Sequence, residues 1–105
     1  DQDRKPILVA DLQASADKLV VRALLATPVE PGKDYELWLL PPGGGAPQSI
    51  GLLRGRETAF DLPHDYTTSL ATGGLAVSLE PAGGSTTGAP TGPVLFVGEM
   101  QPTES

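Results

Sequence analysis

Short runs of alternating hydrophobic and polar side chains recur along the chain, separated by clusters of glycine and proline. A period of two residues between turn-forming residues is typical of β-strands. The pattern predicts seven strands, at 7–11, 18–26, 34–40, 49–54, 57–62, 74–80 and 94–99. The most regular alternation is in 74–80, GLAVSLE. Its expected inward positions are Leu75, Val77 and Leu79, and its outward positions are Ala76, Ser78 and Glu80.

The segments between these strands are predicted to be loops. PPGGGAPQ at 41–48 is a poor strand because proline lacks a backbone donor and glycine has no side chain to pack. Strands 49–54 and 57–62 are expected to form a hairpin across Gly55 and Arg56. The polar stretch 63–73 and the Gly/Pro-rich stretch 81–93 are predicted to be two further loops.

One segment also fits a helix. Residues 9–26 are rich in Ala, Leu, Asp, Lys and Arg, which are compatible with helical structure. A continuous helix, however, spreads the apolar residues over more than one face, whereas a strand gives one unbroken apolar face from Leu19 to Leu25. We therefore predict strand here, with a short helical turn near Ser15 to Asp17.

Seven short strands at regular spacing predict an all-β fold. We expect a single β-sandwich of about seven short strands, with Greek-key-like connections and long Gly/Pro loops. Trp38 lies in the most hydrophobic strand and is expected to fill the core between the sheets, with Tyr35 and Tyr66 as partial fillers. The alternative is that Trp38 forms an exposed platform for a sugar or a peptide.

Composition narrows the function classes. The 105 residues suffice for one small domain with its own core. Cysteine is absent, which excludes thiolate nucleophiles, disulfides and cysteine-ligated metals. The net charge of −6 and the scattered basic residues argue against nucleic acid as a partner. No apolar run approaches the ~20 residues that span a bilayer. Because the chain begins with Asp1 and not with Met, an anchor further upstream stays compatible with the sequence.

No motif for catalysis is found. His64, the single histidine, lies in a Pro-His-Asp loop and is expected to be a solvated surface group. No serine lies in a GxSxG elbow, the motif that places the nucleophile of many hydrolases. The nearest carboxylate pairs, Asp61 with Asp65 and Asp1 with Asp3, lack calcium-loop spacing. The glycine-rich loops neither carry a following lysine nor open a helix, so they are not phosphate cradles. We predict no catalytic, cofactor-binding or metal-binding residue.

Three segments together resemble a known family. YELWLLP at 35–41, SIGLLRG at 49–55 and AVSLEPAGGSTTGAPTGPVLFVGEM at 76–100 resemble the C-terminal domain of the anti-sigma-K factor family, over about 18–100. The signature positions carried by this resemblance are Tyr35, Leu37, Trp38, Ser49, Gly51, Ser78, Glu80, Pro81, Gly83, Gly84, Gly88, Pro90, Gly92 and Pro93.

The resemblance implies a single-pass membrane protein with a regulatory outer domain. A cytoplasmic N-terminal part, outside this chain, would sequester an extracytoplasmic-function sigma factor, and a protease of the intramembrane pathway would act on the stalk. The chain would lie on the extracytoplasmic face of a bacterial cell membrane and touch the membrane only through an upstream helix. Residues 1–6 would be a juxtamembrane-like linker, 7–100 the β-sandwich regulatory domain and 101–105 a flexible tail. No particular oligomeric state is implied.

The signature loop also has a physical interpretation. Pro81 is expected to end a strand and hold Glu80 extended. Gly83, Gly84, Gly88 and Gly92 permit positive φ, and Pro90 and Pro93 restrict the alternatives, which predicts an ordered loop over a sheet edge.

Three hypotheses of function follow. The first is a non-catalytic regulatory module whose folded state or partner controls cleavage of the stalk. The second is a stand-alone extracytoplasmic module that binds a small ligand, glycan or peptide through the Gly/Pro loops and Trp38. The third is a hydrolase, which requires two carboxylates in one cleft within about 10 Å of each other.

Overall fold

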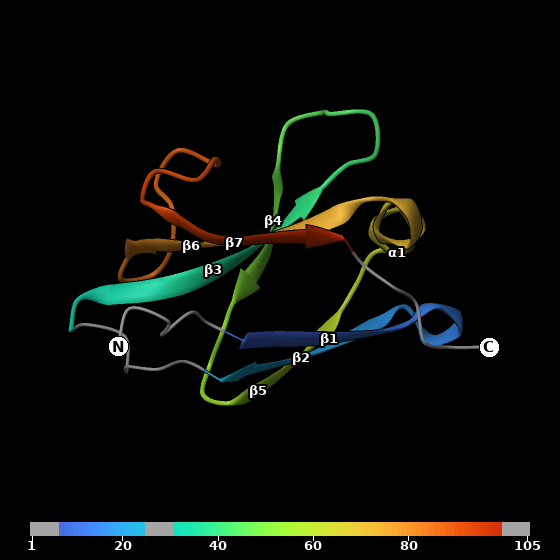
Figure 1. Cartoon of the computed structure of the whole chain (residues 1–105), viewed down its shortest axis with the longest axis horizontal. Coiled ribbons are helices and arrows are strands. Elements are labelled where there is room, and N and C mark those ends of the chain that lie inside the picture. Colours follow the sequence, from blue (N-terminus) through green and yellow to red (C-terminus); the bar gives the residue numbers. More distant parts are fainter. Residues whose placement is uncertain (1–6, 25–30, 100–105) are drawn as a thin grey trace.

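Seven strands form two antiparallel sheets that pack face to face (Figure 1). The computed structural model describes residues 7–24 and 31–99. One sheet has three strands in the order β1-β2-β5, and the other has four in the order β4-β3-β6-β7. The elements are β1 (Ile7–Gln13), the 3₁₀ turn η1 (Ala14–Ala16), β2 (Lys18–Leu24), β3 (Lys33–Leu40), β4 (Gln48–Leu52), β5 (Glu57–Asp61), α1 (His64–Thr72), β6 (Gly74–Pro81) and β7 (Val94–Glu99). The predicted all-β sandwich is confirmed.

The first two strands form a hairpin, as the strand interpretation of this region requires. β1 and β2 pair from Ile7 opposite Leu24 to Gln13 opposite Lys18. The expected helical turn is found at Ala14–Ala16, one residue earlier than predicted, and Asp17 follows it in the left-handed region with φ 51°. Residues 25 and 26, the predicted end of the second strand, lie outside the described residues.

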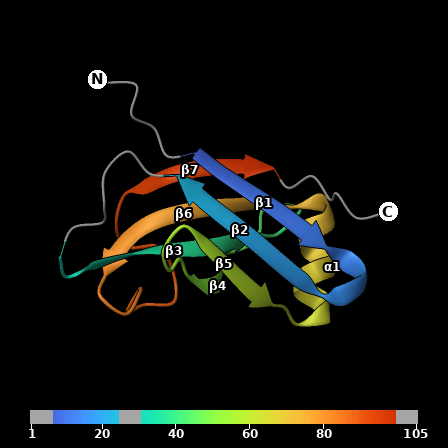
Figure 2. The same cartoon turned by 90° about the horizontal axis from the view of Figure 1, so that it is seen from below.

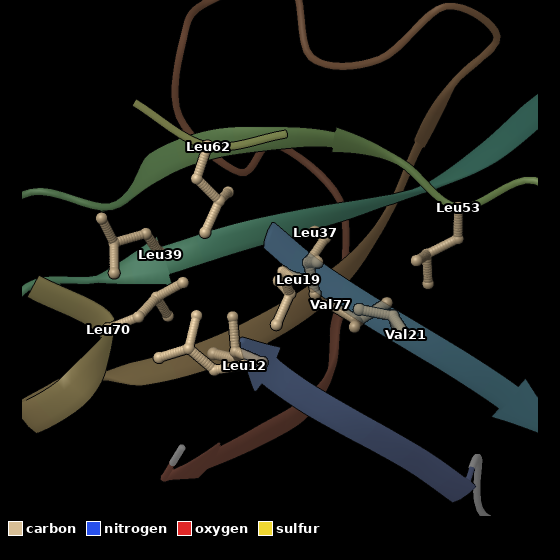
Figure 3. Close-up of a cluster of buried hydrophobic side chains, with 10 residues drawn as sticks. Leu12, Leu19, Val21, Leu37, Leu39, Leu53, Leu62, Leu70 and Val77 are labelled. Carbon is tan, nitrogen blue, oxygen red and sulfur yellow. The ribbon is translucent and has the colours of Figure 1, made fainter. Parts of the chain in front are cut away.

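The hydrophobic core lies between the two sheets and beneath the helix. Its buried members come from both sheets, from α1 and from the segments that lead away from β4 and β5 (Figure 3). They are Leu12, Leu19, Val21, Leu37, Leu39, Leu53, Leu62, Leu70, Leu75 and Val77. Because leucine dominates the cluster, burial of branched aliphatic surface is its main source of stability.

The predicted hairpin across Gly55 and Arg56 is wrong. β4 pairs with β3 in the four-stranded sheet, whereas β5 pairs with β2 in the three-stranded sheet. The chain crosses between the layers after Leu53, whose backbone N–H donates to the carbonyl of Tyr35 at 2.9 Å. Because of this crossing, β4 pairs with the longer strand β3, and β5 pairs with the longer strand β2. The crossing also allows Leu53 and Leu62 to enter the core from different sheets.

The predicted loop at 63–73 is also wrong, because His64–Thr72 forms the helix α1. Pro63 precedes the helix with φ −58° and Asp65 lies in its first turn, both of which favour helix initiation. Thr67 and Leu70, three residues apart, are the buried positions of the helix. Nine residues suffice to carry the chain from one sheet to the other. Within the described part of the chain, no helix has the length and apolarity needed to cross a membrane.

Trp38 is fully buried, as expected for a core filler, but it does not lie between the sheets. Leu37 and Leu39 belong to the central core, so alternation places Trp38 on the opposite, outer face of β3. An indole with 0% exposure offers no platform for a ligand, and the interpretation of Trp38 as a binding surface is therefore wrong.

The outer positions of the strand β6 are covered in the same way. Leu75 and Val77 face the core, as expected. Ala76, Ser78 and Glu80, which were expected to face outward, are all buried, while Leu79 is only half-buried. The centre of the four-stranded sheet is thus covered on both faces, which a simple alternation of hydrophobic and polar residues does not reveal.

Burial of Trp38 leads to a stability prediction. We expect Trp38→Ala to lower the free energy of unfolding by about 3–5 kcal/mol, because a large cavity is left in a site with 0% exposure. Denaturant unfolding measures the change. Val9→Ala, at an exposed position, serves as the control and is expected to change stability by less than about 0.5 kcal/mol. A loss below about 1 kcal/mol for Trp38→Ala contradicts its burial.

Candidate functional site

Most of the signature residues gather on the outer face of the four-stranded sheet. They come from β3, β4, β6 and the connection between β6 and β7, here termed the β6–β7 loop (residues 82–93). Figure 1 shows this loop on the side of the four-stranded sheet that faces away from β1, β2 and β5. Three carboxylates of the sheet, those of Asp34, Glu36 and Glu80, hold the loop there.

Glu80 is the most completely enclosed of the three, with 0% exposure. Its Oε2 accepts hydrogen bonds from the Ser78 hydroxyl at 2.5 Å and from the backbone N–H groups of Thr91 at 3.0 Å and Gly92 at 3.3 Å. Its Oε1 accepts the Thr91 hydroxyl at 2.5 Å. Groups from β6 and from the end of the loop therefore surround both oxygens of a buried carboxylate.

These hydrogen bonds decide the protonation state of Glu80. Burial by itself raises the pKa of the carboxyl, because it disfavours the charged form. The hydrogen bonds from Ser78, Thr91 and Gly92 all favour the charged form, and together they outweigh burial and place the pKa of Glu80 below its ordinary value. Glu80 is thus ionised at neutral pH inside the protein.

Glu36 holds the beginning of the loop in the same way. Its Oε1 accepts the backbone N–H of Ser85 at 2.7 Å, and its Oε2 accepts the Ser49 hydroxyl from β4 at 2.5 Å. The side chain is only 6% exposed. Gly84 is required beside it, because a Cβ there would lie 3.1 Å from Glu36 Oε1 and the residue has φ 104°.

Asp34, at the start of β3, adds a third anchor nearer to solvent. Its Oδ2 accepts the backbone N–H of Gly83 at 2.9 Å, and its Oδ1 lies 3.6 Å from Arg54. Glu36 and Glu80 have no such cation: among the described residues, no Lys, Arg or His forms a salt bridge with either. Backbone N–H groups and hydroxyls take the place of a positive charge at the two buried anchors.

The same network reaches Trp38. The indole Nε1 donates to the Ser78 hydroxyl at 2.9 Å, and this hydroxyl donates in turn to Glu80. The one polar atom of the Trp38 side chain is thereby satisfied inside the protein, as buried indoles require. A continuous path of hydrogen bonds links the largest buried side chain to the backbone of the loop.

Hydrogen bonds within the loop complete its order. The Ser85 hydroxyl donates to the carbonyl of Ala89 at 2.5 Å and accepts the backbone N–H of Thr87 at 3.1 Å. The Thr87 hydroxyl also donates to the Ala89 carbonyl, at 3.1 Å. These contacts fit the ordered loop predicted from the Gly and Pro pattern. The predicted position over a sheet edge is wrong, because the loop lies over the two central strands, β3 and β6.

The signature glycines have two different physical roles. Gly83, Gly84 and Gly88 have positive φ, as predicted. Gly92 does not, so its expected role is wrong: it is required because a Cβ there would collide with the backbone carbonyl of Leu79. The close approach of this backbone to β6 also allows the N–H of Leu79 to donate to the carbonyl of Pro93 at 3.0 Å.

The remaining signature residues contribute to packing. Pro81 ends β6, as expected. Leu37 belongs to the core and Tyr35 packs against it, half-buried. Gly51 of β4 faces the other sheet, where a Cβ would lie 2.9 Å from the Phe60 ring. Pro90, which is half-buried, lies directly before the residue that binds Glu80.

His64 lies at the surface, as predicted, but it has a partner that the spacing did not reveal. Its Nδ1 lies 3.0 Å from Asp17 Oδ1, which joins the start of α1 to the turn between β1 and β2. This hydrogen bond is the main cause that lowers the pKa of Asp17. The contact ties the two segments together.

The other candidate carboxylates do not converge. Asp61 lies at the end of β5, 3.5 Å from Lys18, and Asp65 is exposed in the first turn of α1. Asp1 and Asp3 lie outside the described residues. Across residues 7–24 and 31–99, no group of three or more metal-ligating side chains is found. Glu36 and Glu80, the one pair of nearly buried carboxylates there, are covered by the loop and closed to a substrate.

Sequence reasoning missed Asp34, Glu36, Ser85 and Thr91 as members of this site. A signal was present, because Asp34 and Glu36 lie four and two residues before Trp38 and so share its face of the strand. Carboxylates in line with a buried tryptophan indicate a face that is covered. The segment that covers it is brought there by tertiary structure, which the local pattern does not contain.

Comparison with known proteins gives one match. A family model described as "Anti-sigma-K factor rskA, C-terminal" matches residues 1–94. Neither the curated proteins nor the solved structures compared with the chain contain a match. The matched range includes all the signature positions, from Tyr35 to Pro93.

We expect Glu80→Gln to lower the free energy of unfolding at pH 7 by about 1–3 kcal/mol, because the amide loses the charge and turns a donor toward the N–H groups of the loop. The native protein should gain stability from Glu80 above the unfolded pKa and lose it as pH falls through the lower, folded pKa. Denaturant unfolding as a function of pH measures both effects. Glu57→Gln, at an exposed position, is the charge-matched control; equal losses for the two variants contradict the anchoring role of Glu80.

Alanine substitutions distinguish the two roles of the glycines, positive φ and close backbone approach. Gly88→Ala is expected to cost about 1–2 kcal/mol, since the space around it is open and the cost is that of positive φ. Gly92→Ala is expected to cost about 3 kcal/mol because it forces the loop away from the carbonyl of Leu79. Unfolding by urea compares the two. A smaller loss for Gly92→Ala than for Gly88→Ala contradicts the close approach.

Proposed function

Because the chain belongs to the family of anti-sigma-K factor C-terminal domains, we propose that it is the extracytoplasmic regulatory domain of a membrane-anchored anti-sigma factor. In this proposal, an N-terminal part upstream of the chain binds an extracytoplasmic-function sigma factor and thereby inhibits transcription. The present domain acts through its fold and not through catalysis. The match of the family model to residues 1–94 carries the proposal.

The geometry supports a role that depends on shape. The polar side chains that gather on the outer face of the four-stranded sheet hold the β6–β7 loop, and among the described residues no group of three or more metal-ligating side chains is found. The alternative of a binding module is weakened because Trp38, its proposed platform for a ligand, is fully buried. A folded module that protects a neighbouring segment of chain is the function that these features support best.

Such a domain regulates by being folded or unfolded. Small domains are stable by only ~5–15 kcal/mol, so a partner or a mechanical load shifts the balance with a modest free energy. In the proposal, the folded domain keeps a protease from the stalk between domain and membrane, and its unfolding permits cleavage. Cleavage releases the sigma factor and raises transcription from its promoters.

Expression of the protein with its native upstream sequence, together with a promoter that depends on its sigma factor, tests the proposal. Trp38→Ala, which unfolds or weakens the domain, is expected to raise transcription several-fold without an inducing signal. Val94→Ala, at an exposed position of β7, is the control and should leave transcription unchanged. Unchanged transcription with a domain shown to be unfolded contradicts the proposal, and so does a native reading frame that starts at Asp1 with no membrane helix upstream.

A further inference from the structure

β1 and β5 are the two edge strands of the three-stranded sheet, and β1 is the edge strand that directly follows the N-terminal segment of the chain. β1 lies at the edge of its sheet and has β2 as its single neighbour within the described residues (Figure 2). The β6–β7 loop and its three carboxylate anchors stabilise only the other sheet. β1 depends on its pairing with β2 and on contacts with the core and with α1.

The geometry of the hairpin sets the order in which β1 can be removed. Ile7 and Leu24 form the open end of the pairing, and Gln13 and Lys18 form the end closed by the turn. A load that enters the chain at Ile7 acts on the open end, so it breaks the backbone hydrogen bonds in sequence and not all at once. Opening by successive small steps needs less force than simultaneous rupture of the same bonds.

Burial along β1 follows the same direction. Val9, near the open end, is 49% exposed, and Leu8 and Ala10 are only partly buried against the core. Leu12, next to the closed end, is fully buried. The side chain that resists removal most strongly is therefore among the last to be reached.

Removal of β1 has consequences for the whole sandwich. It leaves β2 and β5 as a two-stranded ribbon, and such ribbons are at best marginally stable in water. It also takes Leu12 from the core and uncovers Leu19 and Val21 beside it. The helix α1, which packs against β1 and η1, loses part of its support.

From these observations we infer that β1 is the release strand of the domain: its peeling from β2, starting at Ile7, is the first step by which the sandwich opens. The inference rests on the proposed function, in which the segment before Ile7 connects the domain to its membrane anchor. It adds to that function the element that responds and the direction of opening.

Hydrogen exchange on the chain tests the order of opening without reference to transcription. The amides of β1 that bond to β2 are expected to exchange at least about tenfold faster than the β2 amides that bond to β5. Equal rates for both sets mean that the sheet opens as one unit, and that result overturns the inference.

Two engineered disulfides provide matched variants, since the chain contains no cysteine. Val9→Cys with Arg22→Cys joins β1 to β2, and Arg22→Cys with Glu57→Cys joins β2 to β5; each pair is directly opposite in the register and exposed. Opposite positions place their Cβ atoms about 4.5–5.5 Å apart, near the spacing that a disulfide needs. The second disulfide closes the longer loop and is expected to stabilise the domain at least as much.

The two disulfides separate release through β1 from a general effect of stability. In the full-length protein with the sigma-dependent promoter, the β1–β2 disulfide is expected to abolish induction, and the β2–β5 disulfide to leave most of it. Reduction of the β1–β2 disulfide should restore induction. Two outcomes overturn the release-strand inference and leave the proposed function in place. In the first, both disulfides inhibit induction equally. In the second, neither disulfide inhibits induction while Trp38→Ala still raises transcription. If Trp38→Ala also has no effect, the proposed function itself fails.

Discussion

Two nearly buried carboxylates that form no salt bridge with any described residue determine how the four-stranded half of the molecule is built. Glu36 and Glu80 lie beneath the β6–β7 loop and are hydrogen-bonded to backbone N–H groups and hydroxyls. A buried charge that lacks such partners is strongly destabilising, so the loop and the carboxylates are stable only together. The loop cannot leave without exposing two charged groups and the hydroxyl that satisfies Trp38. A segment that the sequence predicts as a surface loop is therefore part of the folded structure.

The sequence predicted the elements that depend on local pattern and missed those that depend on tertiary contacts. The seven strands and the turn after β1 follow from alternation and from turn-forming residues, and each was found close to its predicted range. The false hairpin after β4 arose because two neighbouring strands also fit one sheet locally; the choice of partner is made by β2 and β3, which are distant in sequence. The helix α1 was missed because only Thr67 and Leu70 of its nine residues are buried, and two positions give too weak a period.

The outer face of the sheet shows the same limit more sharply. Alternation placed Ser78 and Glu80 on the outward face of β6, and Trp38 was placed between the sheets as a large core filler. Alternation does not reveal that the outward face is itself covered. The β6–β7 loop covers it. Beneath the loop, Trp38 donates to Ser78, Ser78 donates to Glu80, and Ser49 donates to Glu36. The signature glycines were recognised from the sequence, but the carboxylates they accommodate were not all recognised.

The two layers of the sandwich are held by different kinds of contact. In the four-stranded sheet, three carboxylates bind the β6–β7 loop, and Gly84 and Gly92 demand an exact backbone path. The strands β1, β2 and β5 are held mainly by strand pairing and by apolar side chains in the core, a requirement that many sequences meet. The family model covers both layers, since residues 1–94 include β1, β2 and β5. In such a sandwich, the layer that the loop anchors keeps its structure while β1, which has β2 as its single neighbour among the described residues, separates from it.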